Sequence, residues 1–141
     1  MFIKINFIIK KRNKLSKKIK YENKILLEKC AELLNDKHVF DLNAYDVRGV
    51  SSITDFFLVG SVNNDRQMKA AGENLTRQLK KLGVKPLHKD GEMQNSWVVL
   101  DYLDCIVHLF IPKEREHYEI EKMWKGCDCK IELPKQKNEK I

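Results

Sequence analysis

The segment 97-WVVLDYLDCIVHLF-110 decides the fold, because it reads as two apolar strands joined by a tight turn. If Leu103 and Asp104 form that turn, Asp101 and His108 lie on the same face of the hairpin. They are then diagonal neighbours whose backbones are about 7–8 Å apart. A register shifted by one residue would place them on opposite faces, so this pairing is a sharp prediction.

An aspartate and a histidine inside an apolar hairpin have two interpretations. They could form the proton-transfer pair of an active site, or Asp101 could end its strand while His108 makes a local hydrogen bond. A catalytic pair needs a nucleophile or a metal beside it. The sequence contains no G-x-S-x-G, H-E-x-x-H, G-x-G-x-x-G or phosphate-loop motif. The residues therefore favour the structural interpretation.

Other strands are predicted before the hairpin. Alternating apolar residues indicate a half-exposed strand at 39–47, and a continuous apolar run indicates a buried strand at 54–61. The segment 84–87 (VKPL) is also strand-like and leads into a polar turn at 88–95. The strand at 54–61 begins with Thr54-Asp55, to which we assign a structural role at the strand entry.

Helical spacing of apolar residues predicts helices at 23–36, 63–83 and 113–126. In the second helix, Asn64 is the expected N-cap and Gly83 the expected left-handed C-cap. The expected buried stripes are Leu27, Cys30, Ala31 and Leu34 in the first helix, and Met68, Ala71, Leu75, Leu79 and Leu82 in the second.

A last short strand is predicted at 129–133, which gives the order helix, two strands, helix, three strands, helix, strand. A strand–helix–strand crossover among hairpins predicts an α/β fold with a mixed β-sheet flanked by helices. We expect one domain at 22–133, a basic extension at 1–21 and a polar tail at 134–141.

The net charge of +7 is unevenly distributed. Residues 1–20 hold eight Lys or Arg and no acid, whereas residues 21–133 have a net charge of −3. The extension has three interpretations: a disordered basic tail, an organelle transit peptide, or a tail that touches RNA. The acidic domain suits a basic protein partner better than a nucleic acid.

The four cysteines predict neither disulfides nor a metal site. Cys30 and Cys105 fall in core patterns, and the C-x-C pair Cys127 and Cys129 has no second Cys pair or histidine at zinc-finger spacing. Free thiols without a secretory signal favour a reducing cytoplasm. No apolar run approaches the roughly 20 residues that span a bilayer, so no membrane association is expected.

A nucleotidyltransferase is a further class to consider, because 59-VGS-61 is similar to the Gly-Ser turn of those enzymes. Their chemistry needs two carboxylates alternating on a strand to hold magnesium. A helix with Asp65 and Glu73 follows instead. The sequence therefore argues against that activity.

Four stretches carry a more specific pattern: 52-SITDFFLVGS-61, 64-NDRQMKAAGENL-75, 97-WVVLDYLDCIVHLF-110 and 115-REHYEIEKMW-124. Together they resemble the ribosomal silencing factor family, RsfS, also called Iojap-like. The family pieces look like a T-D-[FY] strand, an R-Q-x-x-A-[IA] helix start, a W-x-x-x-D-Y-G-D-x-x-x-H hairpin and R-x-x-Y-x-x-E-x-x-W. The resemblance spans about residues 22–125. Leu103 stands where the family usually has the turn glycine.

The resemblance implies a nucleotidyltransferase-like fold without the active site, and a function without catalysis or cofactor. Proteins of this family bind the large ribosomal subunit through its fourteenth protein, block subunit joining, and repress translation under nutrient limitation. The resemblance points to a partner-binding surface made by Trp97, Asp101, Tyr102, Arg115, Tyr118 and Glu121.

Alternatives stay open at the residue and the protein level. Trp97 and Trp124 could belong to the core, and Arg115 could pair with Glu121 inside the domain. The chain could be an adaptor for another complex, or an enzyme on a nucleotidyltransferase-like scaffold. The sequence leaves open a homodimer through an edge strand, and an organellar location if the extension is a transit peptide.

Overall fold

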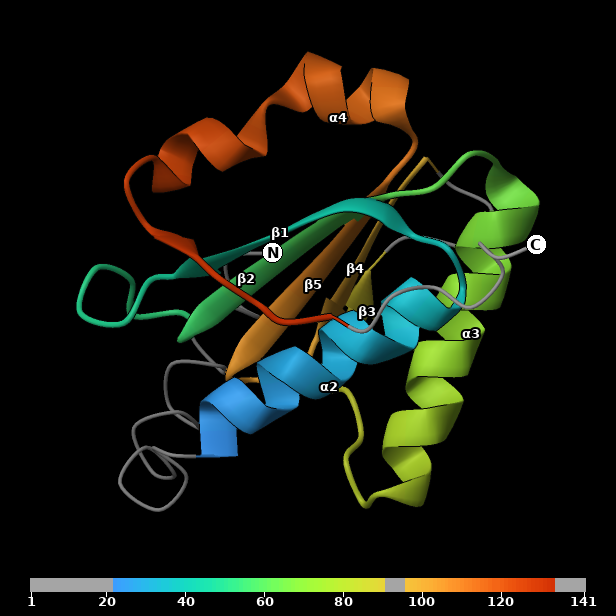
Figure 1. The fold of residues 1–141 in the computed structure, drawn as a ribbon, viewed down its shortest axis with the longest axis horizontal. Coiled ribbons are helices and arrows are strands. Elements are labelled where there is room, and N and C mark those ends of the chain that lie inside the picture. The colour runs from blue at the N-terminus through green and yellow to red at the C-terminus, as the bar shows by residue number, and fades with distance from the viewer. Residues whose placement is uncertain (1–21, 91–95, 134–141) are drawn as a thin grey trace.

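The hairpin of β4 (Trp97–Asp101) and β5 (Cys105–Phe110) lies within a six-stranded sheet of order β3-β4-β5-β2-β1-β6 (Figure 1). The computed structural model describes residues 22–90 and 96–133, and the predicted extension and polar tail lie outside the described residues. The other strands are β1 (Phe40–Asp46), β2 (Phe56–Ser61), β3 (His88–Asp90) and β6 (Asp128–Cys129).

The sheet is mixed. Strands β2 and β5 run parallel, with Phe57 opposite Ile106, and the remaining neighbours run antiparallel. The connection between the parallel strands passes through α3 (Asp65–Lys81), β3 and β4. The predicted α/β class, a mixed sheet flanked by helices, is confirmed.

Helices cover both faces of this sheet. Figure 1 shows α2 (Glu22–Asp36) and α3 on one face, and α4 (Pro112–Tyr118) with the 3-10 helix η1 (Ile120–Trp124) on the other. Both faces of β2 and β5 are therefore buried, which explains their continuous apolar sequences.

The helix α3 follows the sequence prediction at both ends. The side chain of Asn64 accepts a hydrogen bond from the Gln67 backbone N–H, and Gly83 has a φ of +83°. Of the predicted stripe, Leu82 is an error: it is 60% exposed, because the helix ends at Lys81 and the chain turns away. The stripe predicted for α2 is fully buried.

Two strand predictions are wrong in position. The segment 84–87 is not a strand, and β3 instead forms at His88–Asp90, inside the predicted turn. Pro86 has no N–H to donate to a ladder, and pairing begins only where the Leu87 N–H donates to the Asp101 carbonyl. The last strand is confined to Asp128–Cys129, beside β1, rather than spanning 129–133.

The single helix predicted at 113–126 is also wrong, because it is divided at Glu119. This residue has a φ of 49°, in the left-handed region, and its N–H donates to the Arg115 carbonyl to close α4. After the break, η1 buries Ile120 and Trp124 against the sheet. The gain from burying these two side chains offsets the left-handed backbone of a non-glycine residue.

Two apolar clusters result, one on each face of the sheet. The cluster under α2 and α3 includes Cys30 and Cys105, both fully buried, as predicted. The cluster under η1 includes Trp124, which is 9% exposed and stacks on Phe57 with ring centroids 3.9 Å apart. Trp124 therefore belongs to the core, one of the two interpretations of its sequence. Within the described ranges, no helix is long and apolar enough to cross a membrane.

Candidate partner-binding surface

The register predicted for the β4–β5 hairpin is confirmed. Asp101 lies opposite Ile106 and Val99 opposite His108, so the Asp101 and His108 side chains share one face of the sheet. That face lies under η1, and both residues border one pocket there.

The turn keeps its tight geometry without glycine. Leu103 has a φ of 74°, in the left-handed region, and its N–H donates to the Asp101 carboxylate over 2.8 Å. The carboxylate thus stabilises the backbone conformation in which a side chain is disfavoured. Asp101 is 3% exposed, and burial raises its pKa, opposed by the Leu103 hydrogen bond and by His88.

His108 also makes a local hydrogen bond. Its Nδ1 accepts from the Trp97 indole Nε1–H over 3.1 Å. Burial lowers the pKa of His108 to about 4, against the opposing effect of the Glu121 charge, so the ring is neutral at neutral pH. Asp101 and His108 therefore each bond locally, as the structural interpretation of the pair requires.

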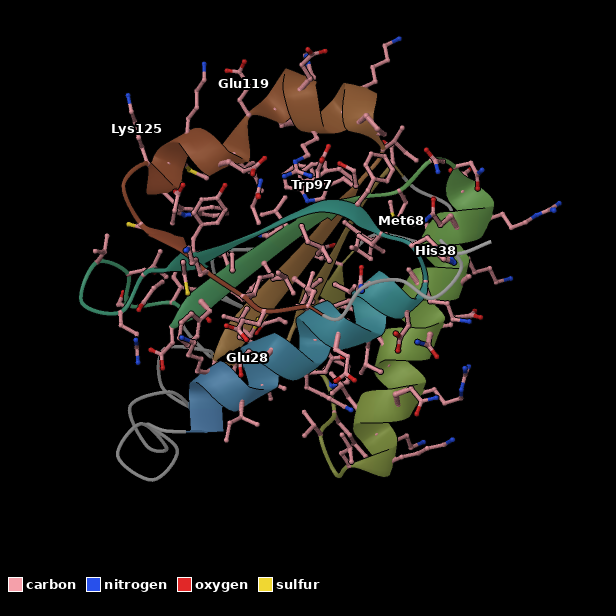
Figure 2. The ribbon with its side chains drawn as sticks, in the orientation of Figure 1. Glu28, His38, Met68, Trp97, Glu119 and Lys125 are labelled. Atoms are coloured by element: carbon pink, nitrogen blue, oxygen red, sulfur yellow. The ribbon has the colours of Figure 1, made fainter. Side chains whose placement is uncertain are left out.

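Trp97 contacts both the buried His108 and the exposed Tyr118. Its indole stacks on Phe110, with centroids 4.8 Å apart, and contacts the ring of Tyr118 at 4.9 Å. Tyr118, the last residue of α4, is 50% exposed. Figure 2 places Trp97 between the sheet and the α4–η1 layer, with Glu119 and Lys125 on the outer side of that layer.

A largely apolar pocket of about 300 Å³ opens beside Trp97. Most of its wall comes from the strands β3, β4 and β5, the 3-10 helix η1 and the loop before β2. Met123, which is 70% exposed, stands at this pocket with Trp97. The polar lining residues are Ser51, His88, Asp90, Asp101 and His108. The pocket has the size of the smaller ligand sites and the composition of a hydrophobic anchor site.

Arg115 and Glu121 face each other, as the second interpretation of their sequence expected. Arg115 Nε and Nη2 donate to the two Glu121 carboxylate oxygens over 2.7 and 2.9 Å. Arg115 Nη1 donates to the Asp41 carbonyl over 2.9 Å and to Ser61 Oγ over 2.8 Å. The Arg115 side chain is only 12% exposed. Its hydrogen bonds connect α4 to η1, β1 and β2, and we call this arrangement the Arg115–Glu121 clamp.

The Asp41 carbonyl reaches Arg115 because β1 is bulged. Asp41 has a φ of 50°, and the pairing register of β1 with β2 shifts between Phe40 and Asn43. Bulges of this kind redirect backbone groups out of the ladder. The bulge in β1 thus supplies one of the oxygen atoms that accept hydrogen bonds from Arg115.

Glu121 is the acceptor at the centre of this network. Tyr45 Oη donates to it over 2.7 Å and Asn43 Nδ2 over 3.2 Å, in addition to Arg115. Burial acts to raise the pKa of Glu121, but the hydrogen bonds from Arg115, Tyr45 and Asn43 outweigh it and hold the pKa at about 2. Burial and the same carboxylate raise the pKa of Tyr45 well above its usual range.

Tyr102 is not part of this surface. It is 4% exposed and lies in the cluster under α2 and α3, on the opposite face from Trp97 and Asp101. Burial raises its pKa to about 12. The alternation of side chains along β4 carries residue 102 to the other face. Tyr102 is therefore a core residue.

The structure thus places Trp97 and Asp101 at the pocket and Tyr118 against Trp97. Arg115 and Glu121 are bound to each other instead. Sequence reasoning missed Met123 and Phe57 as pocket residues. The double-sided burial of β2 was a signal for Phe57. The position of Met123 depends on the break at Glu119, for which the sequence carried no glycine or proline signal.

A second, open hollow is lined by residues of α4, η1, β1 and β2. Acidic residues outnumber basic ones in its lining, which includes Asp41, Glu116, Glu119 and Glu121 against Arg115 and Lys122. Among residues 22–90 and 96–133, no three His, Cys, Asp or Glu side chains are grouped to hold a metal ion.

Sequence comparison gives one consistent family. Residues 20–141 match the family model for the ribosomal silencing factor during starvation, RsfS. RsfS of Bacillus subtilis is 33% identical over 101 residues, covering 72% of this chain and 86% of that protein. RsfS of Haemophilus influenzae is 35% identical over 99 residues, covering 70% and 97%.

Organellar proteins and solved structures are similar as well. The mouse protein called mitochondrial assembly of ribosomal large subunit protein 1 is 29% identical over 101 residues, covering 70% of this chain and 44% of that protein. The chloroplastic protein Iojap of Arabidopsis thaliana is 30% identical over 104 residues, covering 74% and 43%. A Chromobacterium violaceum crystal structure superposes with a TM-score of 0.70 at 26% identity, covering 79% and 92%.

Proposed function

Because this chain belongs to the RsfS family of ribosomal silencing factors, we propose that it binds the large ribosomal subunit through the fourteenth protein of that subunit. Bound there, it blocks subunit joining and so represses translation under nutrient limitation. The family consists of regulatory proteins, and we propose that this member acts by steric obstruction rather than by catalysis.

The observation that carries this proposal is the exposure of two large side chains, Met123 at the pocket and Tyr118 against Trp97, which lines that pocket. Tyr118 and Met123 are 50% and 70% exposed, and Trp97 lies behind Tyr118 at one wall of the pocket. Exposed large side chains grouped around a hollow are typical of binding sites. We propose that Trp97, Tyr118 and Met123 contact the partner and that Asp101 lies at the polar end of the pocket.

The charges next to this group support a basic protein partner. The second hollow is lined by Asp41 and Glu116, and Glu116 lies two residues before Tyr118 in α4. Glu119 of the same hollow pairs with Lys122. Complementary charge at the rim of an interface speeds association and suppresses wrong partners. Arg115 and Glu121, being bound to each other, support the surface from within rather than supplying free charge.

The relatives support association with the ribosome, and they include both bacterial and organellar proteins. The mouse protein is named for assembly of the ribosomal large subunit, and the Arabidopsis protein is chloroplastic. We propose a cytoplasmic location, and an organelle if residues 1–21 act as a transit peptide. Contact of those residues with ribosomal RNA, and a homodimer through an edge strand, are further parts of the proposal.

Co-sedimentation tests this function directly. Purified protein is mixed separately with purified large and small ribosomal subunits and centrifuged through a sucrose gradient. The proposal requires the protein to travel with the large subunit and not with the small one. A protein that stays at the top of both gradients contradicts it.

A further inference from the structure

The indole of Trp97 contacts two aromatic rings, but these contacts alone do not fix its orientation. Phe110 and Tyr118 lie 4.8 and 4.9 Å from its ring centre, at interplanar angles of 26° and 45°. Aromatic contacts tolerate sliding and turning of the ring. The indole has a single polar atom, the Nε1–H, and a hydrogen bond from that atom selects one orientation.

The acceptor of that hydrogen bond is His108 in β5, an interior strand of the sheet. Its backbone pairs with Val59 of β2 on one side and Val99 of β4 on the other. Its ring lies among the rings of Phe57, Phe110 and Trp124, with centroids 5.8 to 6.3 Å away. A side chain held on both flanks and by three rings is a rigid acceptor.

A neutral imidazole is suited to accept the hydrogen bond from Trp97. A neutral histidine has one acceptor nitrogen and one donor nitrogen, whereas a protonated one has no acceptor. His108 is 7% exposed, and burial keeps its pKa at about 4. The charged or titratable groups around it are Glu121 of η1, Asp101 of β4, and His88 and Asp90 of β3. Nδ1 is therefore free to accept from Trp97 at neutral pH.

We propose that His108 is a positioning residue of the docking surface: its Nδ1 fixes the Trp97 indole, and the fixed indole in turn sets the exposed ring of Tyr118. This inference rests on the function proposed above, because it assumes that Trp97 and Tyr118 meet the partner. A histidine inside this strand is thereby explained without catalysis. An apolar residue of the same size would fill the space but leave the indole unfixed.

The first test uses the unmodified protein. A hydrogen bond between two nitrogens transmits a scalar coupling that nitrogen-15 NMR detects. The proposal requires a coupling between Trp97 Nε1 and His108 Nδ1 at neutral pH, with the resonances assigned in Trp97→Phe and His108→Asn variants. A spectrum of well-resolved ring nitrogens without that coupling overturns the proposal.

The second test separates positioning from packing. His108→Leu removes the acceptor and keeps an apolar side chain of similar bulk, whereas His108→Asn places an amide oxygen at the position of Nδ1. We expect His108→Leu to lose the contact between the Trp97 and Tyr118 rings in nuclear Overhauser spectra, and to bind large subunits roughly tenfold more weakly. His108→Asn is expected to restore the ring contact and much of the affinity.

The outcomes are distinguishable from failure of the proposed function. Unchanged ring contacts and unchanged affinity in His108→Leu overturn the positioning role. Equal losses in His108→Leu and His108→Asn overturn it too, because they show that ring packing alone matters. If the unmodified protein does not bind large subunits, the proposed function fails, while the coupling and the ring contacts still decide whether His108 orients Trp97.

Discussion

At the scale of single residues, burial of the His108 ring makes the stability of this protein depend on pH. The folded-state pKa of His108 is about 4, below the ordinary value of 6.5. As the pH falls below 6.5, the unfolded chain therefore takes up a proton before the folded chain does. The stability that depends on neutral His108 is complete above pH 6.5 and is lost as the pH falls toward 4.

We therefore predict that the free energy of unfolding drops by about 2 kcal/mol more between pH 7 and pH 5 in the unmodified protein than in His108→Asn. Urea denaturation at the two pH values measures this difference. Equal pH dependence in the two proteins would show that His108 titrates normally in the fold.

Leu103 provides a second prediction at this scale. Its left-handed backbone, with a φ of 74°, costs any residue with a side chain roughly 1–2 kcal/mol relative to glycine. Leu103→Ala and Leu103→Gly both remove the buried side chain, so they differ mainly in this backbone cost. We expect Leu103→Gly to be more stable than Leu103→Ala by about 1 kcal/mol in urea denaturation. The reverse order would mean that the turn carries no such strain.

At the scale of elements, α4 and η1 are held in place by the Arg115–Glu121 clamp. Glu121 accepts hydrogen bonds from three side chains and is 24% exposed in its side chain, whereas the Glu119–Lys122 pair is 48% and 77% exposed. Partly buried, multiply bonded charges contribute more to stability than exposed pairs. The same substitution at the two positions therefore has different expected costs.

We predict that Glu121→Gln lowers the free energy of unfolding by about 2 kcal/mol, and that the matched Glu119→Gln lowers it by less than about 0.5 kcal/mol. Since the pKa of Glu121 is held at about 2, its contribution is present above its ordinary value of 4.5 and is lost as the pH falls toward 2. Denaturation at pH 7 measures both variants. Similar costs at positions 119 and 121 would contradict the clamp.

The elements also show how far the sequence could be interpreted. The α3 caps and the hairpin register were predictable, because local chemistry at Asn64 and Gly83 and the period of two in β4 and β5 specify them. The division of the last helix at Glu119 was not, because it depends on burial of Ile120 and Trp124 against a sheet built from distant segments. The family pattern predicted Trp97 and Tyr118, which contact each other, and also Tyr102, which is buried under α2 and α3. It did not point to Met123, whose position at the pocket depends on the break at Glu119.

At the scale of the molecule, the two faces of the sheet differ. The face under α2 and α3 holds the larger apolar cluster, and the face under η1 combines a smaller cluster with the pocket and the exposed side chains of Tyr118 and Met123. Replacing one of the exposed side chains on the second face should therefore weaken binding with little effect on folding.

Tyr118→Ala tests this separation, with Leu82→Ala as its control. Leu82 is a similarly exposed apolar residue, 60% against 50%, at the end of α3 rather than on the proposed surface. We predict that Tyr118→Ala weakens large-subunit binding by about 1–3 kcal/mol, and that Leu82→Ala leaves it unchanged. Affinities from quantitative co-sedimentation, with denaturation curves for both variants, measure this. Equal affinities for the two variants would place the binding surface elsewhere.

The central claim, obstruction of subunit joining, is tested most directly by a reassociation experiment. Purified small and large subunits are mixed at a magnesium concentration that favours joining, with increasing amounts of this protein, and the fraction of joined ribosomes is measured in sucrose gradients. We predict that the joined fraction falls in proportion to the large subunits occupied by the protein, and that Tyr118→Ala requires a higher concentration for the same effect. A joined fraction that stays constant while the large subunits are saturated with the protein would contradict this account.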